Sequence, residues 1–379
     1  MRILETLFEI IKEILRAFEN ASSCEIIRNE KKDYNSVGAA VACGCLVIMA
    51  MLSIFFGSKQ AVNGEKHDAM SKKDAVYFPI ISSFALFGLY LSFKIFSKFH
   101  INLLLTGYSC LLGVTALTHS SRPLVNFLMS SMVSKIPFHI LCTKGKGRSK
   151  ENLINLKFSA YDIICLIISI TIGIWYLARK HWIAKNIFGL AFAVNALEML
   201  HLSNIVTGFI LLIGLFFYDI FWSLGANVIV SIAKSFEAPI MLVFPQDWIS
   251  NGINGSNFIM LSLGDIIIPG IFIALLLRFD NSIEGRSSIY FYSALVAYFI
   301  GLMATIVHRI VFKQIQPARL FLVPTCLTTP LLVALLRGEI ETLFAYDDHS
   351  ENKAKKSQSK GLVKPNGKSI KTILWPSNN

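Results

Sequence analysis

Two aspartates stand alone inside long apolar runs of this sequence. Asp219 lies within Leu211–Trp222 and Asp265 lies within Phe258–Leu277. A carboxylate in the middle of a bilayer is costly, so such residues are candidates for function. If the two segments pack together, the carboxyl groups meet and hold one proton between them. One then activates water while the other protonates the carbonyl oxygen of a scissile peptide bond, which is the chemistry of aspartic proteases.

Small and helix-breaking residues lie close to both aspartates. Gly264 removes a side chain next to Asp265, which would let a substrate backbone approach. Pro269 and Gly270 follow about one turn later and would kink or loosen a helix. Such backbone is tolerated in a membrane only where it lines a cavity. For either aspartate alone, a structural hydrogen bond to a neighbouring helix is the alternative.

The composition indicates that lipid surrounds most of the chain. Of 379 residues, 54% are hydrophobic and 16% are charged, and the mean hydropathy is +0.57. A soluble domain carries about 25% charged residues. The net charge is +12, but the basic residues lie between apolar runs, as in membrane loops, so nucleic-acid binding is not predicted. The seven cysteines form no metal-binding spacing, so no metal site is predicted.

Nine segments are long and apolar enough to be transmembrane helices, which need about 20 residues each. The segment 183–200 is the least apolar and contains Asn195 and Glu198; Glu198 and His201 have helical spacing and predict a structural pair rather than a metal site. The fold class predicted is therefore an all-α membrane protein with nine transmembrane helices, at 36–57, 76–97, 101–118, 160–178, 183–200, 205–227, 257–277, 289–312 and 317–336.

Four regions follow from these segments. The first has apolar residues at helical spacing among many charges, which fits an amphipathic helix on the membrane surface or a solvated helix. The last is polar and rich in lysine, which predicts disorder. The regions are an N-terminal segment 1–35, helices one to five in 36–200, the catalytic helices six to nine in 201–337, and a basic tail 338–379.

The distribution of basic residues predicts the orientation. Lysine and arginine concentrate in the loops 58–75 and 119–159 and in the C-terminal tail. Because basic loops stay in the cytosol, the tail is predicted to be cytosolic, and the N-terminus and the loop 228–256 are predicted to be lumenal. The sequons at Asn20 and Asn254 fall on that lumenal side and are candidate glycosylation sites.

Three short motifs resemble those of presenilins and signal peptide peptidases. Phe217-Tyr218-Asp219, Leu263-Gly264-Asp265 and Gln316-Pro317-Ala318 are similar to the YD, GxGD and PAL motifs of this family. Longer stretches, such as the one from Ile268 to Asp280, look like signal peptide peptidase, and the likeness runs from about residue 36 to about residue 346.

The resemblance implies a presenilin-like bundle in the membrane of the endoplasmic reticulum that cleaves type II membrane segments, including leftover signal peptides. It implies that no metal or organic cofactor is needed. It also implies that Asp219 and Asp265 are catalytic and that the residues of the three motifs support them, namely Tyr218, Gly264, Pro317, Ala318 and Arg319.

The sequence departs from the family pattern in three places. Ser262 stands where GxGD has its first glycine, and because serine is small we expect little loss. Arg319 replaces the leucine of PAL; we expect its stem to pack like leucine while the guanidinium reaches the interface, rather than turning toward the aspartates. The chain ends Trp375-Pro376-Ser377-Asn378-Asn379 without a dilysine signal, which leaves retention in the endoplasmic reticulum unexplained.

Two other function classes fit parts of the pattern. A transporter or channel would use the aspartates to relay protons or bind cations. A catalytically inactive relative that escorts membrane proteins would fit Arg319. The specific substrates, homo-oligomers and partners from endoplasmic-reticulum degradation are left open by the sequence.

Overall fold

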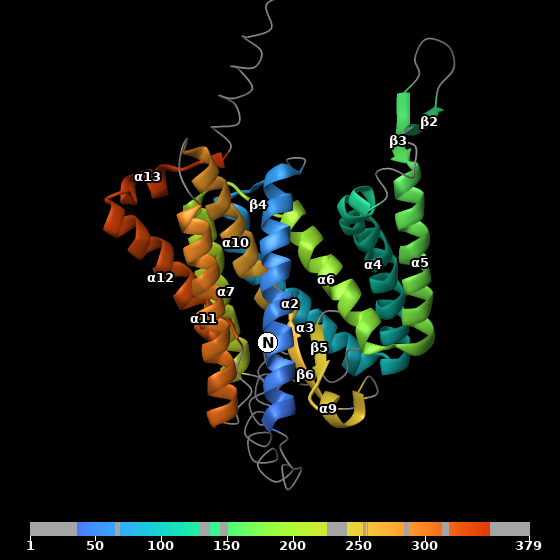
Figure 1. The fold of residues 1–379 in the computed structure, drawn as a ribbon, viewed down its shortest axis with the longest axis horizontal. Helices are drawn as coiled ribbons and strands as arrows, with labels where there is room; N and C mark the ends of the chain where they lie inside the picture. Colours follow the sequence, from blue (N-terminus) through green and yellow to red (C-terminus); the bar gives the residue numbers. More distant parts are fainter. Residues whose placement is uncertain are drawn as a thin grey trace, which may run out of the picture.

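A computed structural model shows a bundle of helices with short strands at its ends (Figure 1). The helices are α2 (Ser36–Asn63), α3 (Lys72–Ile95), α4 (Lys98–Leu128), α5 (Ala160–Arg179), α6 (Trp182–Met199), α7 (Ile205–Gly225), α9 (Trp248–Asn251), α10 (Leu263–Ser282), α11 (Ile289–Phe312), α12 (Arg319–Arg337) and α13 (Ile340–Ala345). The structure describes residues 36–64, 69–128, 137–144, 151–225, 241–252, 255, 257–283, 288–312 and 318–348.

Each of the nine predicted segments overlaps a helix, so the helical membrane fold is confirmed. Within the described residues, six helices are long and apolar enough to cross a membrane, and Ile205–Phe221 of α7 is a shorter apolar helix. The helices α6 and α10 fall outside that set. Polar residues lower the mean hydropathy of α6, namely Lys185, Asn186, Asn195 and Glu198, and α10 carries three charged residues, Asp265, Arg278 and Asp280. The structure therefore shows a multi-pass protein, and the count of nine crossings stays a prediction.

Three two-stranded sheets were not predicted. The strands β1 (Ala69–Met70) and β4 (His201–Leu202) pair in parallel and connect the loop before α3 to the loop before α7. The strands β2 (Pro137–Lys144) and β3 (Glu151–Ser159) are antiparallel and extend beyond α5 (Figure 1). Antiparallel β5 (Met241–Pro245) and β6 (Phe258–Ser262) lie beside the start of α10. The predicted helix 257–277 is therefore wrong at its beginning, because its first residues form β6 and the helix starts at Leu263.

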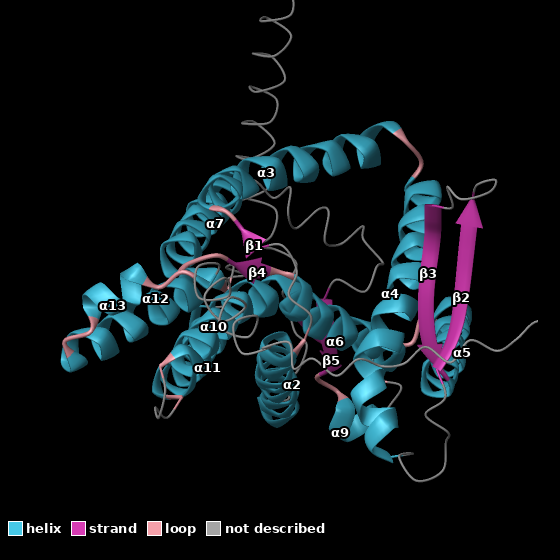
Figure 2. Ribbon diagram, turned by 90° about the horizontal axis from the view of Figure 1, so that it is seen from above, coloured by secondary structure: helices cyan, strands magenta, loops and turns pink. Residues whose placement is uncertain are grey.

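The helix α10 occupies the centre of the bundle. It contacts α2, α6, α7, α11 and α12, and most of its residues are buried. A helix that is apolar on all sides suits such a position. Pro269 lies inside α10 without ending it, since the helix continues to Ser282. Figure 2 shows α10 between α7 and α11 on one side and α6 on the other, with α3 arching from α7 across to α4.

Glycines allow α10 to approach its neighbours closely. A Cβ added to Gly270 of α10 would lie 2.7 Å from Leu197 Cδ2 of α6 and 3.3 Å from Ile54 Cγ1 of α2. Between these two neighbours, a Cβ added to Gly57 of α2 would lie 2.5 Å from Leu197 Cδ1. Across the other face, a Cβ on Gly208 of α7 would lie 2.5 Å from Phe272 of α10. These contacts fix α10 against α2, α6 and α7, which sets where Asp265 lies.

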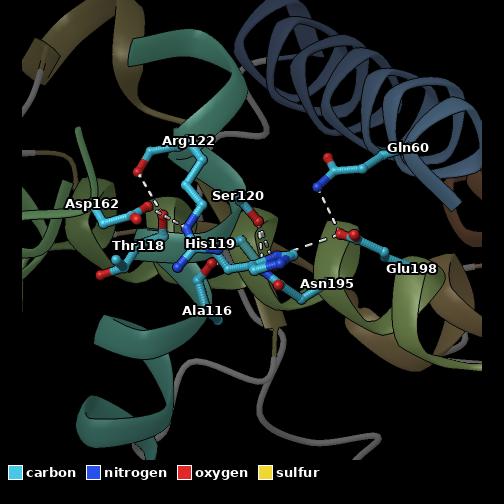
Figure 3. Close-up of polar contacts among 11 residues, drawn as sticks. Gln60, Ala116, Thr118, His119, Ser120, Arg122, Asp162, Asn195 and Glu198 are labelled. Carbon is cyan, nitrogen blue, oxygen red and sulfur yellow. Dashed lines mark hydrogen bonds and ion pairs between the residues drawn. The ribbon is translucent and has the colours of Figure 1, made fainter. Parts of the chain in front are cut away.

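A polar network joins one end of α2, α4 and α6 (Figure 3). Glu198 accepts a hydrogen bond from Gln60 Nε2 at 2.6 Å and lies 3.4 Å from His119 Nδ1. Asn195 Nδ2 donates to the carbonyl oxygen of Ala116 at 2.7 Å and to Ser120. The predicted pair of Glu198 with His201 is thus wrong, because Glu198 turns toward α2 and α4 instead. The network is structural.

The region after α12 packs back onto the bundle. Leu343 of α13 and Tyr346 are buried, and the Asp348 amide donates to Ser203 O at 2.9 Å. Arg278 Nη2 donates to Ala61 O at 3.3 Å, and its Nη1 lies 3.9 Å from Asp348. Residues 338–348 therefore do not belong to the predicted disordered tail, because two apolar side chains anchor them. The remainder of that tail and the segment 1–35 lie outside the described residues.

Candidate active site

The two aspartates come from neighbouring helices and are both buried. Asp219 lies in the second half of α7 and is 3% exposed, whereas Asp265 lies in the first turn of α10 and is 7% exposed. Both helices contact each other and α12. The apolar faces that make α7 and α10 pack thus carry one carboxylate each into the same buried space, as the sequence predicted.

Arg319, the first residue of α12, lies between the two carboxylates. Its Nε is 2.9 Å from Asp219 Oδ2 and 2.9 Å from Asp265 Oδ1. Because both oxygens lie 2.9 Å from the same nitrogen, the distance between Asp219 Oδ2 and Asp265 Oδ1 is at most twice 2.9 Å. The prediction that this guanidinium reaches the interface is wrong. Two buried carboxylates attract a cation strongly in a low-dielectric interior, and this attraction outweighs hydration at the membrane surface.

The two ion pairs differ in their hydrogen bonding. The Nε–H of Arg319 donates a hydrogen bond to Asp265 Oδ1. A single N–H points at one acceptor, and Asp219 Oδ2 makes no hydrogen bond to any described residue although it is buried. Asp219 Oδ2 is consequently the oxygen of the pair at which a reacting water or a shared proton can be bound without breaking an existing hydrogen bond.

Ser262 begins the helix that carries Asp265. Its hydroxyl oxygen accepts a hydrogen bond from the Gly264 amide at 3.3 Å, which caps the N-terminus of α10. A Cβ added to Gly264 would lie 3.6 Å from Ser262 Oγ and 3.7 Å from Arg319 Nη2. Ser262 thus supplies a cap that glycine lacks, and the bare face of Gly264 is turned toward the guanidinium.

A buried asparagine that the sequence did not single out holds the hairpin beside Asp265. Asn186 Nδ2 of α6 donates to the Val243 carbonyl oxygen at 2.7 Å, and the Val243 amide donates to Asn186 Oδ1 at 2.9 Å. The side-chain amide therefore pairs with β5 as a neighbouring strand would. A polar residue within the apolar helix 183–200 was the available signal, but its partner lies 57 residues away in sequence.

The turn before α12 and two tyrosines complete the surroundings. Ala318 is buried and its carbonyl oxygen accepts a hydrogen bond from Thr305 Oγ1 at 3.3 Å. Tyr218 is half-buried next to Asp219. Tyr298 of α11, which the sequence did not indicate, is fully buried within electrostatic range of Asp265, and its hydroxyl has no hydrogen-bond partner in the described part of the chain.

Three of the predicted residues lie outside the described part of the chain, and that part contains no cluster of metal-binding side chains. Pro317, Asn20 and Asn254 lie outside the described residues. Within the described ranges, no three histidine, cysteine, aspartate or glutamate side chains are grouped so as to hold a metal ion. The chemistry that the described site offers is that of its two carboxylates.

Comparison with known proteins agrees with this geometry. The model of the signal peptide peptidase family matches residues 62–350, which include both aspartates and Arg319. The signal peptide peptidase of Homo sapiens is 48% identical over 344 residues, covering 86% of this chain and 91% of that protein. The chain belongs to the signal peptide peptidase family. The Mus musculus protein is 49% identical over 331 residues, covering 85% of this chain and 88% of its own length.

A less similar relative carries the name of an intramembrane protease. Intramembrane protease 2 of Caenorhabditis elegans is 40% identical over 296 residues, covering 68% of this chain and 63% of that protein. With six helices suited to a membrane in the part of the chain that the structure describes, the chain is a multi-pass intramembrane aspartic protease of the signal peptide peptidase family.

Proposed function

We propose that Asp219 and Asp265 are the catalytic pair with which this signal peptide peptidase family member cleaves type II membrane segments, such as leftover signal peptides. The observation that carries the assignment is the convergence of two buried carboxylates, from α7 and α10, on one guanidinium. The proposed location is the membrane of the endoplasmic reticulum, with the N-terminus lumenal and the C-terminus cytosolic, because basic residues concentrate on the tail side.

The reaction needs the pair to share one proton. One carboxylate removes a proton from water as the water attacks the peptide carbonyl, and the other donates its proton to the carbonyl oxygen. Because two carboxylates this close titrate as a unit, the roles belong to the pair and not to either residue. Arg319 holds the place between them in the resting state, so its guanidinium has to shift when water and substrate enter.

The hairpin beside Asp265 suits an extended substrate. Asn186 covers the outer side of β5, whereas β6 pairs only with β5 among the described strands and ends at Ser262, three residues before Asp265. A peptide must be unwound before it is cleaved, and an extended peptide can add to a strand by main-chain hydrogen bonds. The helices 36–200 would then form a scaffold around the catalytic helices 201–337.

The test is cleavage of a membrane-embedded signal peptide by purified protein in liposomes. Asp219→Asn and Asp265→Asn should each reduce turnover to background, because either change removes a carboxylate that must gain or lose a proton. Thermal unfolding and gel filtration should show that both variants keep the fold. Substantial turnover by either variant would refute the catalytic pair.

A non-catalytic escort is the one other function that a specific observation favours. Arg319 stands between the aspartates, where the PAL leucine of the family would put no charge. If neither the wild type nor Arg319→Leu cleaves any peptide, while both bind signal peptides in a pull-down with liposomes, the escort function replaces the protease.

A further inference from the structure

The guanidinium of Arg319 takes its counter-charge from the catalytic pair. Its side chain is 15% exposed, and its charged partners among the described residues are Asp219 and Asp265. A buried cation without an anion is strongly unfavourable, because its hydration is lost and nothing replaces it. In the resting protein the two aspartates satisfy Arg319, and Arg319 in turn offsets the repulsion between them.

Catalysis withdraws part of that counter-charge. One aspartate must be protonated to act as the acid, and the other must face the attacking water. A water or proton bound at Asp219 Oδ2 weakens the pairing of that oxygen with Nε, which lies 2.9 Å away, while Asp265 Oδ1 keeps its hydrogen bond to Nε. As the reaction begins, Arg319 therefore keeps one ionised partner instead of two. Its hydrogen bond to another described residue uses Nε, so its Nη donors are available to an anion of the substrate.

The position of the guanidinium limits where that anion can be. A Cβ added to Gly264 would lie 3.7 Å from Nη2 of Arg319. This nitrogen is therefore close to the end of β6 and to the carboxylate of Asp265. A planar guanidinium binds a carboxylate with two parallel hydrogen bonds. Since an extended chain advances roughly 3.3–3.6 Å per residue, a carboxylate held by Arg319 belongs to a residue within about two positions of the scissile bond.

We propose that Arg319 makes this protease selective for substrates with a carboxylate within about two residues of the scissile peptide bond. The substrate carboxylate binds the guanidinium of Arg319 when the two aspartates bind water and the scissile peptide. It can be an aspartate or glutamate side chain, or the free α-carboxylate of a peptide that has already been shortened. This inference rests on the proposed function of Asp219 and Asp265 and names the substrate class of the same site.

The test uses one membrane-spanning peptide whose cleavage position has been mapped by mass spectrometry. Variants carry aspartate, isosteric asparagine or leucine at the first or second position after the scissile bond. A second set ends two residues after that bond, with either a free carboxylate or an amide. Each peptide is cleaved in liposomes by the wild type, Arg319→Leu and Arg319→Lys, and kcat/KM is measured for each combination.

The wild type should cleave the aspartate peptide, the free-carboxylate peptide or both at least about tenfold more efficiently than the matched neutral peptide, which is roughly 1.4 kcal/mol. The set that shows the preference identifies the source of the carboxylate. In Arg319→Leu the preference should disappear or reverse, and turnover of the leucine peptide should rise because the aspartates are no longer occupied. Arg319→Lys should keep a weaker preference, since lysine offers a charge without the planar fork.

Two results would overturn the selectivity. One is equal cleavage of charged and neutral peptides by the wild type, a comparison that needs no variant and stands even if Arg319→Leu does not fold. The other is a preference that persists in Arg319→Leu. Both differ from failure of the proposed function, in which the wild type cleaves no peptide of either set.

Discussion

Asn186→Ala tests whether the hairpin beside Asp265 is positioned by one side chain. The change removes both hydrogen bonds to the buried Val243 peptide, at 2.7 Å and 2.9 Å, and leaves its amide and carbonyl without these partners. A buried polar group left unsatisfied costs about 1–3 kcal/mol, whereas hydrogen bonds between membrane helices average only about 0.6 kcal/mol. Since two backbone groups are affected, we expect the free energy of unfolding to fall by about 2 kcal/mol.

Activity should fall more than this loss of stability explains. The strand β5 pairs with β6, and β6 ends at Ser262, which caps the first turn of α10 that carries Asp265. A displacement of about 1 Å at a catalytic group can lower a rate about 100-fold. We expect kcat for a membrane-embedded signal peptide to drop at least tenfold, which corresponds to about 1.4 kcal/mol of activation free energy.

Asn195→Ala is the matched control. Asn195 is another buried asparagine of α6, but it binds Ala116 O and Ser120 of α4, away from the hairpin (Figure 3). The Asn195→Ala variant should lose a similar amount of unfolding free energy, while its kcat stays within about threefold of the wild type. The assay pairs thermal unfolding in detergent with initial rates in liposomes. If Asn186→Ala and Asn195→Ala lower kcat equally, the hairpin is not positioned by Asn186.

Further predictions concern packing, capping and orientation. Gly270→Ala should lower the free energy of unfolding by about 1–3 kcal/mol, because its Cβ would lie 2.7 Å from Leu197, whereas Gly107→Ala has open space around it and should be neutral; equal melting temperatures would contradict this. Ser262→Ala should cost about 1 kcal/mol through the lost cap of α10, and Ser262→Gly only a few tenths; chemical denaturation of both would show whether the order holds. Asn20 should be glycosylated in microsomes while a C-terminal tag is digested by added protease, and a protected tag would reverse the orientation.

The sequence predicted the helices and the aspartate pair because both depend on local features. A transmembrane helix is recognisable from its length and apolar content alone, and Asp219 and Asp265 stand out because charge is rare in such runs. The beginning of α10 was predicted wrongly because Phe258–Ser262 is a short apolar run, and such a run fits either a strand or the start of a buried helix.

The features that could not be predicted depend on partners distant in sequence. The direction of Arg319 is decided by two carboxylates that only the folded bundle brings within 2.9 Å. The role of Asn186 depends on the backbone of Val243. The order of residues 338–348 depends on Leu343 and Tyr346, whose burial a polar, lysine-rich composition conceals.

The contact of Leu197 with Gly57 and Gly270 has a consequence for the order in which the protein is made. The three residues belong to α2, α6 and α10, and α10 is synthesised long after the other two helices. The ribosome must therefore have passed residue 270 before the last face of Leu197 is covered. Until then the side of Leu197 that packs against Gly270 stays open to the bilayer, and folding of this core is completed late in translation or after it.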